Sequence, residues 1–256
     1  MAPRNTSQPK MSVLRCPLQR KARVAVKKSL QDKDLILLRG DPFSGKSTVL
    51  SQLFSSTGDP KYLWPVIIRS LHVHVCKSLK LSLAHALGLS SSVMAASPGA
   101  LTSVLHELSN KNVLVVLVID DIDVFFLGPT EEYRKACDFI FYVSKTLARL
   151  KIVGAFSQLE NIRSIAKDLR IENYCVLELP CWQATVEFHE FVIYVANKFG
   201  IDKHQISNEG FLKTLFESTR GATGAIVTSI KILHMSGVLD GGKVACSKHL
   251  RQLWRF

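Results

Sequence analysis

The feature that most constrains this chain is a loop signature in its first fifth. The pattern G-x-x-x-x-G-K-[ST] is matched by Gly40, Asp41, Pro42, Phe43, Ser44, Gly45, Lys46 and Ser47. In such a loop the glycines let backbone N–H groups face phosphates, the lysine reaches the outer phosphates and the hydroxyl ligates Mg²⁺. We therefore predict that these eight residues and Thr48 bind a nucleotide, and that Lys46 also takes part in catalysis.

The flanks of this P-loop have the order that the motif requires. Residues 34–39 form a short apolar run typical of a buried strand, and residues 47–54 have the apolar spacing of a helix. Phosphate then lies at a helix N-terminus, where unpaired N–H groups favour anions. This context distinguishes the motif from a chance match in an ordinary turn.

A second motif supplies the carboxylates. The apolar run at residues 113–119 is followed directly by Asp120 and Asp121, with Asp123 close behind. Mg²⁺ is commonly held, mainly through water, by an acid at the end of a buried strand near the P-loop. We expect Asp120 and Ser47 to form the metal site, and Asp121 to orient or deprotonate the attacking water. An ordinary acidic turn is the alternative explanation.

Phosphoryl transfer also requires a polar group near the γ-phosphate and usually a cation. Ser157 and Gln158 follow the expected strand at residues 151–156, where such a sensor lies, and Ser157 is our catalytic prediction. Arg163, Arg170 and Arg220 are candidate cations, in cis or from a neighbouring subunit. A loop cap and ordinary surface arginines are the alternatives.

The order of elements predicts an α/β fold. Strands are expected at residues 34–39, 64–69, 113–119, 151–156 and 176–179, and helices at 77–88, 99–110 and 131–149, with a loop between 90 and 98. Alternating strands and helices indicate a parallel five-stranded sheet flanked by helices. After Pro180 only helical spacing remains, at 188–199, 208–218 and 225–236, which predicts a small C-terminal helical lid.

Charge is concentrated at the two ends of this 256-residue chain. Residues 1–28 carry eight Lys or Arg and residues 243–256 carry four, with no acid in either range, and together they account for the net charge of +12. We divide the chain into a basic N-terminal extension (1–28, with a possible basic helix at 18–31), a core (29–182), a lid (183–242) and a basic tail (243–256). Basic ends favour contact with a polyanion such as nucleic acid. Solvated tails are an equally good explanation, and an organelle transit peptide is a weaker one because of three prolines.

The sequence disfavours a membrane-spanning protein and a cysteine-based metal site. No run of about 18 uncharged apolar residues occurs, so no membrane span is expected. The six cysteines are scattered without metal-ligand spacing, which is typical of reduced thiols in a cytosolic protein.

Taken together, P-loop, paired acids, sensor and lid resemble an AAA+ ATPase, and several stretches resemble the TniB/TnsC family of transposition ATPases. These stretches are residues 119–134, the sensor strand 152–157, the Leu-Pro-x-Trp segment at 179–182 with Glu187-Phe188, and the Gly-x-x-Gly-x-Ile motif at 221–226. The resemblance covers about residues 30–240. It places Gly224 at the nucleotide and DNA-facing residues at Lys77 and Lys80, although a solvated helix face explains these lysines equally well.

The resemblance implies an ATPase that takes ATP and Mg²⁺, forms rings or filaments on double-stranded DNA, and recruits a transposase, with a TniQ-like protein at one end. Hydrolysis then drives disassembly, and a bacterial cytoplasmic, nucleoid-associated location follows. Two departures stand out. Asp121 replaces the usual Glu, so hydrolysis is expected to be slow, and Asn173-Tyr174 replaces an Arg-Phe pair, which leaves Arg170 as a substitute trans-acting arginine.

Two other functions stay open. A replication-initiator or clamp-loader-like AAA+ ATPase would share the site, but normally has a winged-helix domain after the lid, for which about 14 residues are too few. An ATP-binding scaffold would bind nucleotide through the same loop and hydrolyse it negligibly.

Overall fold

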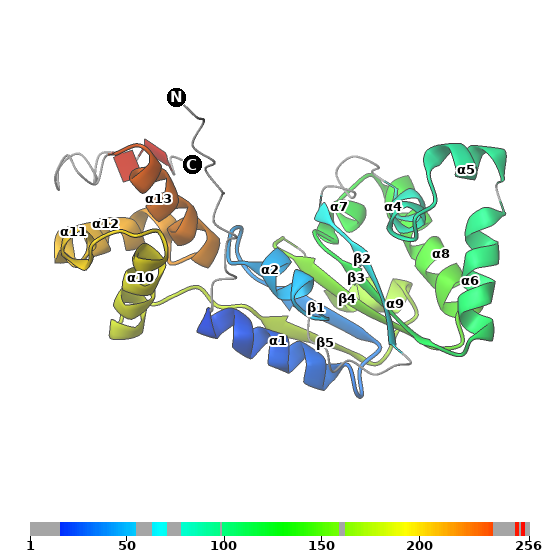
Figure 1. Ribbon diagram of the computed structural model, residues 1–256. Helices are drawn as coiled ribbons and strands as arrows, with labels where there is room; N and C mark the ends of the chain where they lie inside the picture. Colours follow the sequence, from blue (N-terminus) through cyan, green and yellow to red (C-terminus); the bar gives the residue numbers. More distant parts are fainter. Residues whose placement is uncertain are drawn as a thin grey trace, which may run out of the picture.

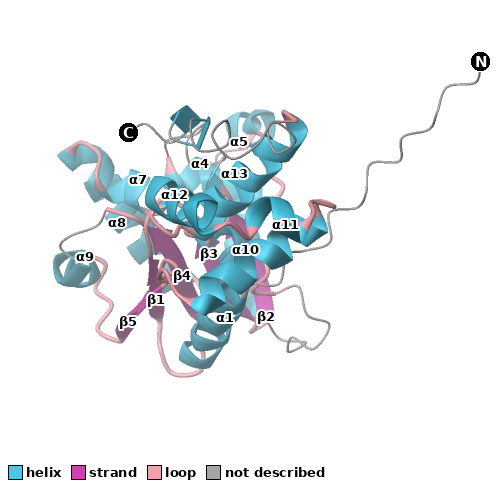
Figure 2. Ribbon diagram, turned by 90° about the vertical axis from the view of Figure 1, so that its left-hand side faces the viewer, coloured by secondary structure: helices cyan, strands magenta, loops and turns pink. Residues whose placement is uncertain are grey.

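The computed structural model describes residues 16–54, 63–70, 78–97, 99–158, 162–237, 249–250 and 252–253. Its centre is one five-stranded sheet with the order β2-β3-β4-β1-β5, and every neighbouring pair is parallel. The strands are β1 (Leu35–Arg39), β2 (Leu63–Ile68), β3 (Leu114–Ile119), β4 (Leu150–Phe156) and β5 (Tyr174–Glu178). Helices cover both faces of the sheet (Figures 1 and 2). The predicted α/β architecture is confirmed.

The helices of the core precede, separate and connect the strands along the chain. They are α1 (Pro17–Ser29), α2 (Lys46–Ser51), α4 (Leu79–Ala86), α5 (Ser91–Ala96), α6 (Ala100–Asn110), α7 (Asp123–Phe126), α8 (Thr130–Thr146) and α9 (Ile162–Asp168). The lid contains α10 (Val186–Lys198), α11 (Lys203–Ile206), α12 (Glu209–Thr219) and α13 (Thr223–Met235).

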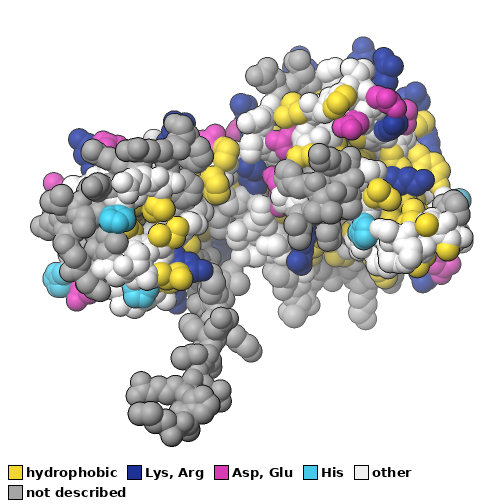
Figure 3. All heavy atoms as spheres, turned by 90° about the horizontal axis from the view of Figure 1, so that it is seen from above, with side chains coloured by type: hydrophobic (Ala, Val, Ile, Leu, Met, Phe, Trp, Pro, Cys, Tyr) yellow, Lys and Arg dark blue, Asp and Glu magenta, His cyan; other side chains and the backbone are white. Residues whose placement is uncertain are grey.

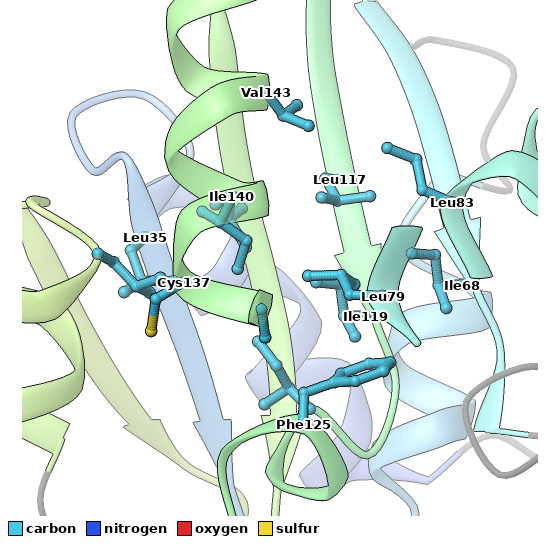
Figure 4. Close-up of a cluster of buried hydrophobic side chains, with 14 of the residues drawn as sticks. Leu35, Ile68, Leu79, Leu83, Leu117, Ile119, Phe125, Cys137, Ile140 and Val143 are labelled. Atoms are coloured by element: carbon cyan, nitrogen blue, oxygen red, sulfur yellow. The ribbon is translucent and has the colours of Figure 1, made fainter. Parts of the chain in front are cut away.

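Burial on both faces explains why the strands are apolar runs rather than alternating sequences. In β1, Leu35 and Leu37 pack against one set of helices, whereas Ile36 and Leu38 pack on the opposite face. Helices α4, α6, α7, α8 and α9 cover the first face, and α1 and α2 cover the second. Figure 4 shows the first face, where side chains of β1, β2 and β3 meet those of α4 and α8.

The lid has a hydrophobic core of its own. Phe188, Phe191, Val192 and Val195 of α10 pack against side chains of α12 and α13. Gly200, whose φ is +75°, follows the end of α10, as the sequence predicts, because glycine adopts this left-handed conformation without a Cβ penalty. Seen from above, the lid and the core form two lobes (Figure 3).

Trp182 begins the lid. Its ring stacks on Phe191 with 4.6 Å between centroids, and its backbone N–H donates to the carbonyl oxygen of Gly221 over 2.8 Å. A Cβ on Gly221 would lie 2.2 Å from the carbonyl oxygen of Trp182, and the φ of Gly221 is +70°. A hydrogen bond therefore connects the segment between sheet and lid to the turn before α13, and only glycine fits at position 221 in that turn.

Helix α1 belongs to the core by packing, although all but its last residue lies in the range 1–28 that we predicted to be an extension. Its Ala22 packs with Leu38 and Val49, and its Val26 packs with Ile36 and Leu50. Its N-terminal end also reaches the lid, because Cys16 is part of the lid core and Leu18 packs against both lid and core.

In the described part of the chain, four short helices were not predicted: α5, α7, α9 and α11, of four to seven residues each. Such segments show too few turns for a clear apolar period. Helix α5 lies in the predicted loop at 90–98, buries none of its residues, and begins where Ser90 accepts a hydrogen bond from the N–H of Val93. Helix α8 ends at Thr146, three residues before the predicted end, because Leu147 is extended.

Some predictions fall outside the described residues. These are Lys77, residues 1–15 and most of the basic tail at 243–256. Within the part of the chain that the structure describes, no helix is both long and apolar enough to cross a lipid bilayer.

Candidate nucleotide site

The P-loop connects the carboxyl end of β1 to the first residue of α2, in the strand-loop-helix order predicted from the sequence. Gly45 has a φ of +100°, and a Cβ there would lie 1.8 Å from the side-chain nitrogen of Gln19. A Cβ on Gly40 would lie 2.7 Å from the hydroxyl of Ser44 and 3.1 Å from the carbonyl oxygen of Leu179. The left-handed φ of Gly45 favours glycine there, Gly40 lies close to the backbone of Leu179, and the Gln19 side chain of α1 lies directly against the loop.

Lys46 and Ser157 are brought together as predicted, although 111 positions separate them. The Nζ of Lys46 donates to the hydroxyl of Ser157 over 2.7 Å and to the carbonyl oxygens of Gly40 and Asp41 over 2.8 and 3.0 Å. Burial lowers the pKa of the Lys46 amine, and the nearby carboxylates oppose that shift. Neighbouring β1 and β4 produce this meeting, because both strands end at the same edge of the sheet.

Asp120 and Ser47 also meet, as the predicted metal site requires. Asp120 follows β3, is 6 % exposed, and accepts a hydrogen bond from the Ser47 side chain. Burial raises the pKa of the Asp120 carboxyl, and the Ser47 hydrogen bond opposes this.

The donors at this position fit Mg²⁺. The Oδ1 atom of Asp120 is buried without a hydrogen-bond partner, and so is the hydroxyl of Ser44 in the P-loop. Unpaired buried oxygens are rare in folded proteins and call for an explanation such as an ion or ligand. A hydroxyl and a carboxylate oxygen are the hard ligands that Mg²⁺ takes beside water and phosphate.

Asp121 has a strained backbone conformation next to the candidate metal site. Its φ is +50°, in the left-handed region that non-glycine residues seldom adopt. Its Oδ2 accepts a hydrogen bond from the hydroxyl of Ser70, which lies just after β2, the neighbouring strand. Sequence reasoning missed Ser70. The available signal was a polar residue just beyond an apolar strand, which is too common to single out.

Asp123, the third acid expected near the site, does lie near Lys46 and has a specific contact of its own. It is 9 % exposed, and its Oδ2 accepts from the backbone N–H of Ser157 over 3.0 Å and from that of Gln158 over 3.4 Å. The carboxylate of Asp123 therefore holds the turn after β4, and with it the hydroxyl that contacts Lys46.

The lid touches the P-loop at the predicted Gly224. Its backbone N–H donates to the carbonyl oxygen of Phe43 over 2.6 Å, and a Cβ there would lie 2.7 Å from that oxygen. Phe43 itself has a φ of +61° and a side chain that is 52 % exposed. The start of α13 is thus fitted onto the loop backbone, with Thr223 also contacting Cys16.

Among the remaining predicted residues, Arg170 has a contact away from the P-loop and three others are exposed. Arg170 lies near the amino end of β5, and its guanidinium lies 4.2 Å from the centre of the Phe141 ring. Lys46, by contrast, follows the carboxyl end of β1, which is parallel to β5. The role of Arg170 toward a neighbouring subunit stays a prediction. The side chains of Arg163, Arg220 and Lys80 are exposed on α9, after α12 and on α4. Lys77 lies outside the described residues.

Comparison with known proteins gives structural similarity only. No family model matches the chain, and no curated protein matches it. The fold is similar to the Walker-type ATPase PABY2304 of Pyrococcus abyssi, with a TM-score of 0.62 and 14 % identity over 92 % of this chain and 71 % of that one. It is also similar to Cdc6p of Pyrobaculum aerophilum, with a TM-score of 0.56 and 14 % identity over 90 % of this chain and 65 % of that one. At this identity the similarity establishes a shared fold.

Proposed function

We propose that this protein is a Mg²⁺-dependent ATPase of the AAA+ type that works as an initiator-like switch on DNA. The observation that carries the proposal is the contact of the P-loop lysine, Lys46, with Ser157 at the end of the adjacent strand, next to Asp120 and Asp121. These are the groups that phosphoryl transfer to water requires: a phosphate cradle, a cation, a metal ligand and a base.

Each residue has a defined task in this proposal. The P-loop N–H groups and the Lys46 amine would bind the phosphates, and Ser157, which contacts the same amine, would lie near the outermost phosphate. Ser47 and Asp120 would hold Mg²⁺, which neutralises charge on the phosphate oxygens when bound. Asp121 accepts a proton from the attacking water.

The hydrogen bond from Ser70 bears on the rate. It engages one oxygen of the Asp121 carboxylate, and that carboxylate is one methylene shorter than a glutamate. The first feature occupies one of the two carboxylate oxygens and the second shortens its reach toward water, so we expect slow hydrolysis. This observation keeps the ATP-binding scaffold as a second candidate, which differs only in having negligible turnover.

The lid contact supports a switch. The backbone N–H of Gly224 is hydrogen-bonded to the P-loop carbonyl of Phe43. A change in the loop conformation when a triphosphate binds would therefore move the start of α13. The position of the lid then depends on the nucleotide, which is what a regulator needs.

The choice of an initiator-like role rests on the comparisons and on charge. Cdc6p is among the similar structures, which favours the initiator-like alternative over the transposition regulator that sequence motifs favoured. This chain spans 65 % of that protein's length. The net charge of +12 is consistent with a nucleic-acid partner. Recruitment of a transposase and a TniQ-like protein, and self-assembly on DNA, stay predictions.

The test compares Lys46→Ala with Lys111→Ala, which removes the same charge from an exposed lysine paired with Glu107. Binding of a fluorescent ATP analogue, ATP hydrolysis and duplex DNA binding with ATP, ADP or no nucleotide are measured. We expect Lys46→Ala to lose nucleotide binding and the ATP dependence of DNA binding, with Lys111→Ala unchanged. Equal nucleotide affinity in both variants would refute the site. Tight ATP binding without turnover would select the scaffold.

A further inference from the structure

Helix α1 has two opposite faces of different chemistry. Gln19, Ala22 and Val26 are buried against the P-loop and the sheet. At about 100° per residue these three positions fall within about 60° of one another around the helix. In Figures 1 and 2 the helix lies along the outside of the sheet. One side of α1 is therefore committed to the core.

The opposite side is basic. Arg20, Lys21 and Lys28 are exposed, and Lys27 is half-buried. Together with Val24 they occupy an arc of about 120°, whose centre lies about 170° to 190° from that of the buried face. The helix contains no acidic residue. We call the residues Arg20, Lys21, Val24, Lys27 and Lys28 the α1 basic face.

We propose that the α1 basic face binds the phosphate backbone of a nucleic-acid duplex. Arg20 and Lys28 are about 12 Å apart along the axis, because the rise is about 1.5 Å per residue. That distance corresponds to the rise of about three to four base pairs along a duplex axis, at roughly 3.4 Å each. Contacts of this kind are made to phosphates, so they give affinity and orientation without reading sequence. The proposal rests on the proposed action on DNA and deepens it by assigning the surface.

An anionic membrane is the other partner that a basic helix meets, and the geometry disfavours it. A helix that lies in a membrane interface buries an apolar face among lipids. The apolar face of α1 is already used against Leu38, Val49 and Ile36. Val24, 59 % exposed, is the one apolar side chain of the basic face.

The location of this face links it to the nucleotide site. Gln19, on the buried side of the same helical turn as Arg20, lies against Gly45 of the P-loop. Leu18 packs against both lid and core, and the charge of Lys21 acts on Glu187 of α10. A duplex on this face would thus lie across the helix that contacts P-loop and lid.

The experiment uses the full chain and two charge-matched triple variants. Arg20→Gln/Lys21→Gln/Lys28→Gln removes three cations from the α1 basic face. The control, Lys111→Gln/Lys135→Gln/Lys213→Gln, removes three exposed cations that each pair with a glutamate one helical turn away. Affinity for duplex DNA, duplex RNA and vesicles of phosphatidylcholine with phosphatidylserine is measured between 50 and 300 mM salt, beside ATP-analogue binding.

We expect the α1 variant to bind duplex at least about tenfold more weakly near 0.1 M salt, and the slope of log affinity against log salt to fall by about 2 to 3, since each phosphate contact contributes about 0.9. The control should keep the wild-type slope, and all three proteins should bind the ATP analogue equally. Comparison of the affinities for duplex DNA and duplex RNA identifies which duplex the α1 basic face binds. Equal losses in both variants, or a loss confined to vesicles, would overturn the proposal. If the wild type binds ATP but no duplex, this inference fails and the ATPase stands. If it binds duplex through α1 but no ATP, the ATPase fails alone.

Discussion

The turn that carries Ser157 depends on one buried carboxylate, and removing it gives a sharp prediction. In Asp123→Ala the N–H groups of Ser157 and Gln158 lose the Oδ2 acceptor that lies at 3.0 and 3.4 Å. A hydrogen bond to a charged group contributes about 1.5–3 kcal/mol, and a buried donor left unpaired adds its own cost. With one good and one long bond, we expect the free energy of unfolding to fall by about 3 kcal/mol.

Function should fall as well, because the Ser157 hydroxyl lies 2.7 Å from the Lys46 amine and loses its support. A displacement of about 1 Å in a catalytic group costs up to about 100-fold in rate. We expect kcat for ATP hydrolysis to drop about 10- to 100-fold, with the affinity for ATP changed less than about threefold. Asp123→Asn keeps one acceptor oxygen and should lose about 1 kcal/mol and less activity.

Urea unfolding, steady-state ATPase kinetics and binding of a fluorescent ATP analogue measure the three quantities. A variant that is destabilised as expected but hydrolyses ATP at the wild-type rate would refute the positioning role of Asp123. Complete loss of ATP binding in a folded Asp123→Ala protein would contradict it in another way, because the carboxylate would then contact the nucleotide itself.

Three further predictions concern single positions. Asp120→Asn should abolish Mg²⁺-dependent nucleotide binding. It should also stabilise the nucleotide-free protein at pH 7, because burial raises the pKa of the Asp120 carboxyl and so disfavours its charged form in the folded state. In urea unfolding, this gain in the free energy of unfolding should be full above the raised pKa and vanish below the ordinary value of 3.8. Gly221→Ala should lower the free energy of unfolding by about 2 kcal/mol or more in urea titrations, since its Cβ would meet the carbonyl oxygen of Trp182 at a φ of +70°, and wild-type stability would contradict this. Burial, followed by the charge of Asp41, raises the pKa of the Cys181 thiol to about 11. Iodoacetamide should therefore modify this thiol slowly at pH 8 and faster in Asp41→Asn, as measured by mass spectrometry of the peptide that contains Cys181. Equal rates in the two proteins would exclude the influence of Asp41.

Much of the fold was predictable because its signals are local. Strands buried on both faces are apolar runs, and residues 113–119 predicted β3 within one residue of its observed start at Leu114. Helix periodicity likewise predicted a helix at 131–149, where α8 spans Thr130–Thr146. The short helices α5 and α7 carry too few turns for a period, so their positions came only from the structure.

Part of the candidate site was predictable for a similar reason. A P-loop is a contiguous sequence signature, because the conformation of its backbone requires glycine at fixed positions. The acid after a buried strand is a second short signature. Their meeting in space follows from the parallel sheet, which brings the carboxyl ends of its strands to one edge. Ser157 was predicted on that basis and lies against Lys46.

The sequence by itself thus determined the longer helices and the strands, and it indicated which residues have the chemistry to bind phosphate and metal, because both depend on short-range periodicity and side-chain chemistry. Only the tertiary structure decided how those residues are held. Ser70 reaches Asp121, Asp123 supports Ser157, and Gly224 meets Phe43 across gaps of 51, 34 and 181 positions in the chain. Such contacts depend on strand order and on how the lid packs, and a local pattern of residues carries no information about either.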